Sequence, residues 1–129
     1  MDERPVRVVL RDSIAETGPG DAGTVVVSGS HGGISAARFA LAVPLAAVVF
    51  NDAGIGKDGA GIAGLALLDT VERPAFAVRH DSARIGDAAD TLASGVVSTA
   101  NSAAARRGVR PGQSARDAVR QVASGAVLC

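Results

Sequence analysis

Aromatic residues are nearly absent from this sequence. It has no tryptophan, no tyrosine and three phenylalanines among 129 residues. Proteins that bind single-stranded nucleic acid stack bases on aromatic side chains within a positively charged groove. Here 13 lysines and arginines balance 13 aspartates and glutamates, so no excess of positive charge is present. We therefore expect no nucleic-acid partner and no attraction to an anionic membrane surface.

Cysteine and long hydrophobic segments are also scarce. The single cysteine, Cys129, has no partner for an internal disulfide, which is typical of a cytoplasmic protein. No run reaches the roughly 18 apolar residues that a membrane-spanning helix needs. The charged opening MDERPVRVV is not followed by the apolar core of a signal peptide. We expect a cytoplasmic protein without a membrane segment.

The composition that remains is that of one globular domain covering residues 1–129. Hydrophobic residues make up 47% of the chain and charged residues 20%. Most of the apolar residues are small, and each buries little area. A domain of this size built from them leaves apolar helix faces to be covered, so we expect a homo-oligomer.

Short apolar runs alternate with helical segments along the chain. Continuous apolar runs, typical of strands buried on both faces, occur at Val6–Leu10, Thr24–Ser28, Leu45–Phe50 and Ala75–His80. Small-residue helices are expected at Ile34–Ala42 and Ala60–Glu72, and a final helix at Ala115–Ala123 after Ser114 as N-cap. The run GVVS, at a break in the helical pattern at Gly95, reads either as helix or as a further strand. The order predicts an α/β fold: a small three-layer sandwich whose mainly parallel sheet of three to five strands is built from βαβ units.

Polar residues follow three of the predicted strands. They are Ser30 and His31 after the first, Asn51, Asp52 and Lys57 after the second, and His80, Asp81, Ser82 and Arg84 after the third. Ligands of open parallel sheets bind outside the carboxyl ends of the strands, so these residues are expected to share one cleft. The alternative is that each group only caps the helix that follows it.

The stretch Ser-Gly-Ser-His-Gly at residues 28–32 has the strand–turn–helix setting of a nucleophile elbow. In this interpretation Ser30 is a catalytic nucleophile and the backbone of Gly32 and Gly33 lies beside the substrate. Asp52 and His80 follow in the order acid then histidine. The competing interpretation makes Ser30 an ordinary turn residue.

Acid–base chemistry needs no serine nucleophile. His31 and His80 are candidates for proton transfer, with Asp52 and Asp81 orienting them. In the same hypothesis Lys57 and Arg84 hold a negative group of the substrate, and Asn51 and Ser82 add hydrogen bonds to it. Histidine and carboxylate could also hold a divalent metal, but no spacing here matches a metal motif, and we predict neither a metal nor a cofactor.

The glycine-rich loop at residues 54–64 offers a different function. Gly54, Gly56, Gly59, Gly61 and Gly64 satisfy the pattern G-x-G-x-x-G twice at the start of a helix. Such loops bind phosphate through their backbone amides, and Gly61 and Gly64 could instead serve only close packing.

The sequence thus favours a small-molecule enzyme, a hydrolase that cleaves an amide- or ester-like bond in a small polar or anionic metabolite. The alternative is a non-catalytic module that binds a nucleotide or phosphate through the loop at residues 54–64.

Overall fold

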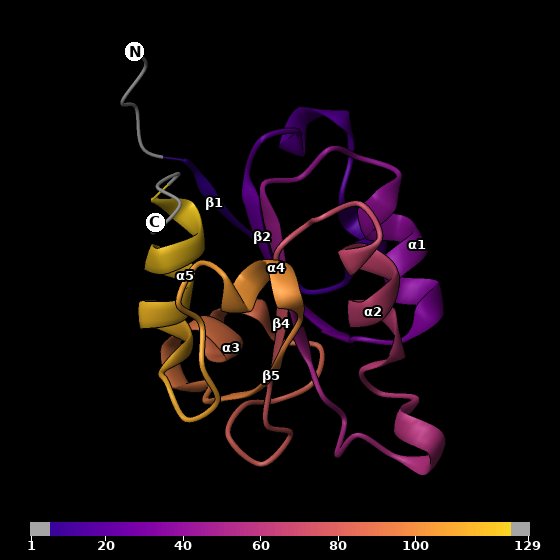
Figure 1. The fold of residues 1–129 in the computed structure, drawn as a ribbon, viewed down its shortest axis with the longest axis vertical. Coiled ribbons are helices and arrows are strands. Elements are labelled where there is room, and N and C mark those ends of the chain that lie inside the picture. Colours follow the sequence, from indigo (N-terminus) through magenta and orange to yellow (C-terminus); the bar gives the residue numbers. More distant parts are fainter. Residues whose placement is uncertain (1–5, 125–129) are drawn as a thin grey trace.

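The chain folds into a five-stranded sheet with helices on both faces (Figure 1). The structure is a computed structural model that describes residues 6–124. Cys129, for which we expect no disulfide, lies outside the described residues. The expected α/β class and three-layer arrangement are confirmed.

The sheet has the strand order β1-β2-β3-β4-β5. The strands are β1 (Val8–Arg11), β2 (Val25–His31), β3 (Ala47–Asn51), β4 (Ala75–Val78) and β5 (Val97–Ala100). The first four run parallel, and β5 pairs antiparallel with β4. The run GVVS is therefore mostly strand, and the sheet is mainly parallel as expected.

The helices form two layers around the sheet. They are α1 (Ile34–Leu41), α2 (Ala63–Asp69), α3 (Ala88–Ser94), α4 (Ser102–Ala105) and α5 (Ala115–Ala123), with short 3-10 turns η1 (Ile14–Glu16), η2 (Pro19–Asp21) and η3 (Lys57–Gly59). Figure 1 shows α1 and α2 on one side of the sheet and α3 and α5 on the other. None of the helices within residues 6–124 is long and apolar enough to cross a membrane.

The central strands are buried because both of their faces are covered. Alternate side chains of β2 enter different cores: Val25 and Val27 pack toward α3 and α5, and Val26 packs toward α1 and α2. All of β3 and β4 is buried as well. This burial on two faces explains why the strands read as unbroken apolar runs.

The winding of the sheet affects where a ligand could bind. In doubly wound sheets a crevice opens where the strand order reverses, but β1 to β4 follow one another without a reversal. After β4 the segment 79–87 instead crosses the carboxyl edge and brings α3 against β2, where the Gly86 N–H donates to the Gly29 carbonyl at 2.7 Å. This crossing segment shapes the edge of the sheet on which the predicted site residues lie.

Candidate functional site

The end of β2 is a bulge. Val27 is paired with Val49 and His31 with Asn51, so the three residues Ser28, Gly29 and Ser30 of β2 lie opposite one residue of β3. Ser28 Oγ donates to the Val49 carbonyl at 2.7 Å, inside the bulge. A Cβ at Gly29 would lie 2.4 Å from the Asp87 backbone nitrogen, so this position needs glycine. Ser30 consequently belongs to a bulged strand, whereas the serine of a nucleophile elbow lies at the turn itself.

Ser30 and His31 have local partners. Ser30 Oγ accepts a hydrogen bond from the Ile14 N–H at 2.9 Å, and His31 Nδ1 accepts one from the Gly33 N–H at 3.3 Å. Among the described residues no hydrogen bond or ion pair joins Ser30 to a histidine. The nucleophile role of Ser30 stays a prediction for which the structure provides no activating base.

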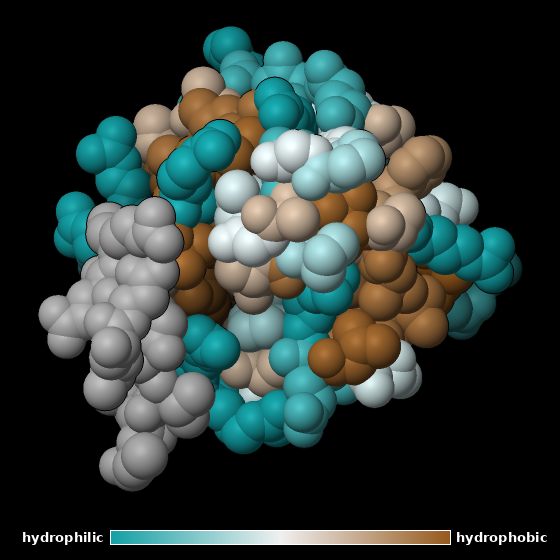
Figure 2. All heavy atoms as spheres, turned by 90° about the horizontal axis from the view of Figure 1, so that it is seen from above, coloured by the Kyte–Doolittle hydropathy of each residue, from teal (hydrophilic) through white to brown (hydrophobic). Residues whose placement is uncertain are grey.

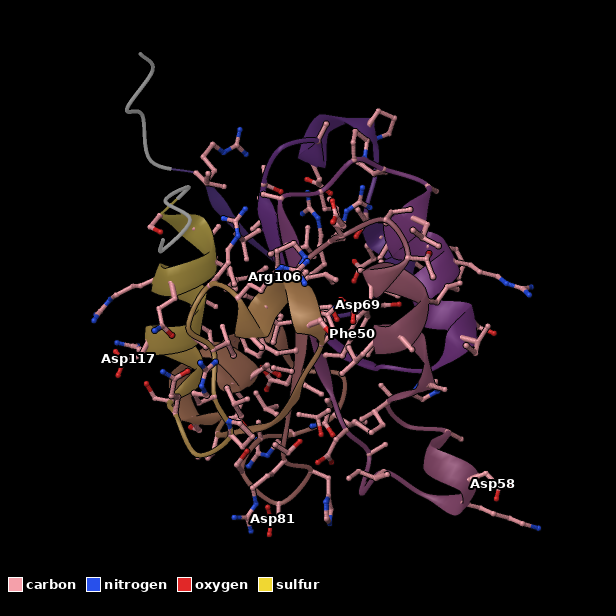
Figure 3. The ribbon with its side chains drawn as sticks, in the orientation of Figure 1. Phe50, Asp58, Asp69, Asp81, Arg106 and Asp117 are labelled. Atoms are coloured by element: carbon pink, nitrogen blue, oxygen red, sulfur yellow. The ribbon has the colours of Figure 1, made fainter. Side chains whose placement is uncertain are left out.

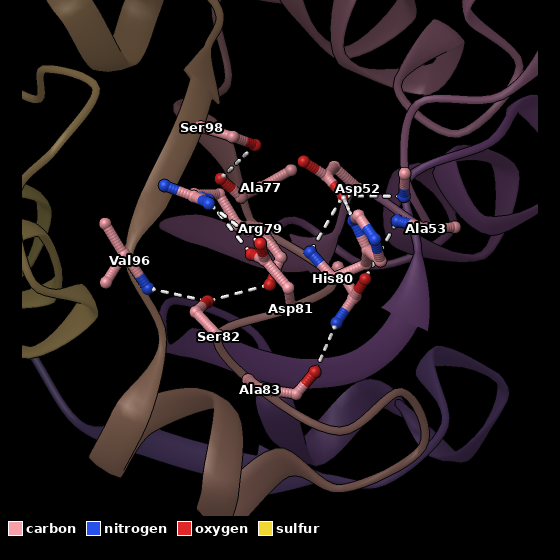
Figure 4. A network of polar contacts seen from close by, with 12 residues as sticks. Asp52, Ala53, Ala77, Arg79, His80, Asp81, Ser82, Ala83, Val96 and Ser98 are labelled. Carbon is pink, nitrogen blue, oxygen red and sulfur yellow. Dashed lines mark hydrogen bonds and ion pairs between the residues drawn. The ribbon is translucent and has the colours of Figure 1, made fainter.

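Asp52 and His80 form the pair that the sequence suggested (Figure 4). Asp52 is buried, and its Oδ1 accepts hydrogen bonds from the backbone N–H of Gly54 at 2.8 Å and of His80 at 3.0 Å. The same oxygen lies 3.6 Å from His80 Nδ1. The His80 side chain is 59% exposed, so its other ring nitrogen is open to a substrate. A buried carboxylate behind an exposed imidazole is the arrangement of a general base and its orienting acid.

Two other predicted site residues are occupied by contacts that shape the crossing segment. The Asn51 amide donates to the Ala83 carbonyl and accepts from the Ala53 N–H, so both of its polar atoms are used. Ser82 Oγ donates to the Arg79 carbonyl and accepts from the Val96 N–H (Figure 4). These bonds fasten the first half of the segment, residues 79–83.

Asp81 is paired with Arg79 and not with a histidine. The Arg79 guanidinium donates to both carboxylate oxygens of Asp81 at 3.0 and 2.8 Å. This hydrogen bonding holds the pKa of Asp81 below its usual value. Both side chains are about half exposed, at 56% and 52%. Asp81 is thus committed to an ion pair on the surface.

The two cations expected to hold an anionic substrate make no hydrogen bond or ion pair with Asp52 or His80 among the described residues. Lys57 is the first residue of η3. The next residue of η3, Asp58, lies at an extremity of the molecule, far from Asp81 (Figure 3). Arg84 is exposed and is bonded through its backbone N–H to Asp90. The role of Lys57 and Arg84 in holding an anionic group stays a prediction.

Gly32 and Gly33 contribute close packing. Gly32 donates from its N–H to the Asn51 carbonyl, and a Cβ on it would lie 3.0 Å from the Gly61 carbonyl. Gly33 is the N-cap residue of α1. A Cβ on Gly33 would lie 3.1 Å from Cε1 of the His31 ring. Their role beside a substrate stays a prediction.

The glycine-rich loop uses its backbone amides internally. The N–H groups of residues 53, 54, 55, 56, 59 and 61 all donate to oxygens of residues 51–56. A Cβ at Gly61 would lie 2.1 Å from the Asp52 carbonyl, and one at Gly64 would lie 2.4 Å from the Gly33 carbonyl. Since phosphate-binding loops need free amides, this geometry favours the packing interpretation of these two glycines.

The backbone next to Asp52 is strained. Residues 53–56 all have positive φ, and two of them, Ala53 at 51° and Ile55 at 67°, are not glycine. Left-handed backbone is costly for a β-branched residue such as Ile55. Strained residues gather at functional sites, where the surrounding structure holds them in place, so this loop adds weight to the site at Asp52.

An open cavity of about 370 Å³ lies at the carboxyl ends of β1 and β2. Its lining includes the predicted residues Ser30 and His31 and the unpredicted residues Asp12, Phe39 and Ile85. Phe39 and Ile85 lie in segments that read as helix and loop, and only tertiary structure shows that they face one cavity. The available signal was the rarity of phenylalanine, of which this chain has three.

Metal ligands do not gather in the described part of the chain. Within residues 6–124 no group of three or more His, Cys, Asp or Glu side chains could hold a metal ion. Comparisons with protein-family models, with curated proteins and with solved structures found no match. The geometry of the site therefore stands alone as the basis for a function.

Proposed function

We propose that this chain is a hydrolase of small molecules in which His80 is the general base and Asp52 orients it. The observation that carries the proposal is the position of Asp52 Oδ1, 3.0 Å from the backbone nitrogen of His80 and 3.6 Å from its Nδ1. These contacts direct Nδ1 inward and leave Nε2 outward, where a base must be to reach a substrate.

The proposed reaction is attack of water on an amide- or ester-like carbonyl. His80 Nε2 takes a proton from water as the water oxygen bonds to the carbonyl carbon. The protonated imidazole then gives its proton to the departing nitrogen or oxygen as the bond from carbon to that atom breaks. The products are a carboxylic acid and an amine or alcohol. Asp52 stabilises the imidazolium that forms between the two steps.

Water is favoured over Ser30 as the nucleophile. The Ser30 hydroxyl accepts a hydrogen bond from the Ile14 N–H, and no hydrogen bond joins it to a histidine among the described residues. His31 has an exposed ring at the neighbouring cavity, and in this proposal it contacts the substrate.

The test is turnover of a panel of small amides and esters, followed by release of acid and of amine. His80→Gln and Asp52→Asn should each lower kcat by about 10²–10⁴ on any substrate that the wild-type chain cleaves. Asparagine keeps the oxygen that accepts from Gly54 and His80, so the second variant should remain folded. Arg116→Gln, on the exposed face of α5, is the matched control.

Two outcomes would overturn the proposal. One is a wild-type chain that cleaves no member of the panel. The other is full turnover by both His80→Gln and Asp52→Asn. The binding module with a phosphate loop is distinguished by thermal melting, since a nucleotide at a hundredfold its Kd stabilises its protein by about 2.7 kcal/mol.

The homo-oligomer and the cytoplasmic location are further proposals. Val8 and Leu10 of the edge strand β1 are 41% and 43% exposed, which supports a contact with a second copy along this edge. Size-exclusion chromatography with light scattering gives the mass in solution, and a monomer at all concentrations overturns the first of the two.

A further inference from the structure

The cavity at the ends of β1 and β2 has two apolar walls. Phe39 of α1 is 49% exposed, and Ile85 of the crossing segment is 57% exposed. The other two phenylalanines, Phe50 and Phe76, are fully buried. The one exposed aromatic side chain among the described residues therefore lines the cavity.

Apolar surface is also exposed at the opposite end of the molecule, which Figure 2 views from the top of Figure 1. Figure 2 shows hydrophobic residues gathered on the side where α1 and α2 lie. Large apolar side chains that remain in water beside a cavity are typical of ligand sites. A ring held against Phe39 would gain from aromatic contact in addition to the area that it buries.

Among the polar residues that line the cavity, Asp12 supplies a negative charge. Asp12 is exposed, and one of its carboxylate oxygens accepts from the Ala88 N–H at 3.0 Å. Ser30 and His31 supply a hydroxyl and an imidazole. The lining contains neither lysine nor arginine. An anionic ligand would therefore meet a carboxylate and no cation.

We propose that this cavity binds a small molecule that carries an aromatic ring next to an amino group, and that it discriminates against the corresponding acid. The ring lies between Phe39 and Ile85, and the ammonium group lies toward Asp12. As a statement about the substrate of a hydrolase this rests on the proposed function; as a statement about binding it does not. It differs from the anionic substrate expected from Lys57 and Arg84.

Three probes of one shape test the proposal on the full chain. They are benzylamine, benzyl alcohol and benzoate, titrated at about pH 8, where an ordinary imidazole is neutral. Binding is followed by amide chemical shifts of ¹⁵N-labelled protein. We expect benzylamine to bind about three- to fivefold more tightly than benzyl alcohol, which is the size of an exposed ion pair. Benzoate should bind more weakly than either, with the shifts confined to residues that line the cavity.

Two variants separate the contribution of the Phe39 ring to binding from that of the Asp12 charge. Phe39→Ala should weaken benzylamine and benzyl alcohol alike, by about tenfold. Asp12→Asn keeps an oxygen for the Ala88 N–H and should remove the preference for benzylamine over benzyl alcohol. Val71→Ala and Asp117→Asn, an exposed apolar residue and an exposed acid that do not line the cavity, are the matched controls.

The possible results distinguish failure of the cavity proposal from failure of the hydrolase proposal. Equal binding of benzoate and benzylamine, or unchanged binding by Phe39→Ala, overturns the proposal, as do shifts scattered over surfaces outside the cavity. Turnover of the amide and ester panel without benzylamine binding removes the cavity proposal and leaves the hydrolase standing. Benzylamine binding without any turnover removes the hydrolase proposal and leaves the cavity proposal standing.

Discussion

His31 and His80 place their Nδ1 atoms against opposite kinds of partner, a hydrogen-bond donor at His31 and a carboxylate at His80. Nδ1 of His31 accepts a hydrogen bond from the Gly33 N–H at 3.3 Å, whereas Nδ1 of His80 faces the Asp52 carboxylate at 3.6 Å. A ring nitrogen that accepts a hydrogen bond carries no proton, and one that faces a carboxylate does. Neutral His31 therefore has its proton on Nε2, and neutral His80 has its proton on Nδ1.

Long-range ¹H–¹⁵N correlation spectra should show these two tautomers directly. The chain has two histidines, so His31→Gln assigns both sets of signals. At about pH 8 we expect the Nδ1–H tautomer for His80 and the Nε2–H tautomer for His31. In Asp52→Asn the preference at His80 should weaken, because the charge that favours a proton on Nδ1 is gone. The Nε2–H tautomer at His80 in the wild type would refute its role as the base.

Gly29→Ala should destabilise the fold. The added methyl group would lie 2.4 Å from the Asp87 nitrogen and 2.5 Å from the Gly86 carbonyl carbon, both of which are backbone atoms. We expect a loss of about 1–3 kcal/mol, seen as a lower melting temperature by far-UV circular dichroism. Gly20→Ala is the control, since no atom lies within 4 Å of its Cβ position. Equal melting temperatures for the two variants would show that the segment after β4 does not pack as described.

Asn51→Asp should loosen the crossing segment. Asn51 Nδ2 donates to the Ala83 carbonyl at 3.1 Å, and an aspartate at this fully buried position would present an acceptor to an acceptor. We expect a loss of about 1–3 kcal/mol in stability and faster hydrogen exchange of the amides in residues 79–87. A residue that only bound substrate would instead change KM without a change in exchange. Unchanged exchange with a raised KM would therefore restore Asn51 to the binding site.

Asp21 should contribute stability that is lost in acid. The Arg11 guanidinium donates to both of its carboxylate oxygens, and with the Gly18 N–H it holds the pKa of Asp21 below its ordinary value. Because the pKa is lower in the folded state, the contribution is complete above the unfolded pKa of about 3.9 and disappears as the pH falls through the folded value.

The measurement compares wild-type and Asp21→Asn chains by urea unfolding at several pH values. We expect the variant to be about 1–3 kcal/mol less stable at neutral pH, with the difference shrinking below about pH 4. Asp117→Asn, from an exposed ion pair with Arg120, should change stability by less than about 1 kcal/mol. A difference that stays constant down to about pH 2 would contradict the assignment.

The layers of this fold could be predicted because they depend on patterns that are local in the sequence. The buried strands are unbroken apolar runs, and α5 begins after Ser114, whose Oγ accepts from the Asp117 N–H as expected of an N-cap. Strand direction is not encoded in this way. Val97–Ala100 pairs antiparallel with β4 because the connection through α3 ends where it began, at the carboxyl end of β4, where the Arg79 N–H donates to the Val96 carbonyl. The four-residue pattern of the strand carries no sign of that.

The position of the site at the edge of the sheet could be predicted from the sequence, but the contacts between its residues could not. Asp52 and His80 follow adjacent strands, so their proximity follows from the order of the sheet. The separation of Ser30 from them depends on the bulge in β2, which is held by Gly29 and Gly86 across 57 positions of the sequence. Phe39 and Ile85 line one cavity only in the folded chain, and no periodicity in the sequence shows it.

The hydrogen bond from the Ala88 N–H to Asp12 joins residues 76 positions apart. The cavity beside it is assembled from the ends of β1 and β2, from α1 and from residues 85 and 86, so it does not exist in a growing chain until most of the protein has been made. A ligand of this cavity would consequently recognise only chains in which β1, β2, α1 and the segment before α3 are already packed together. Its binding would therefore report that β1 and α3 have packed together.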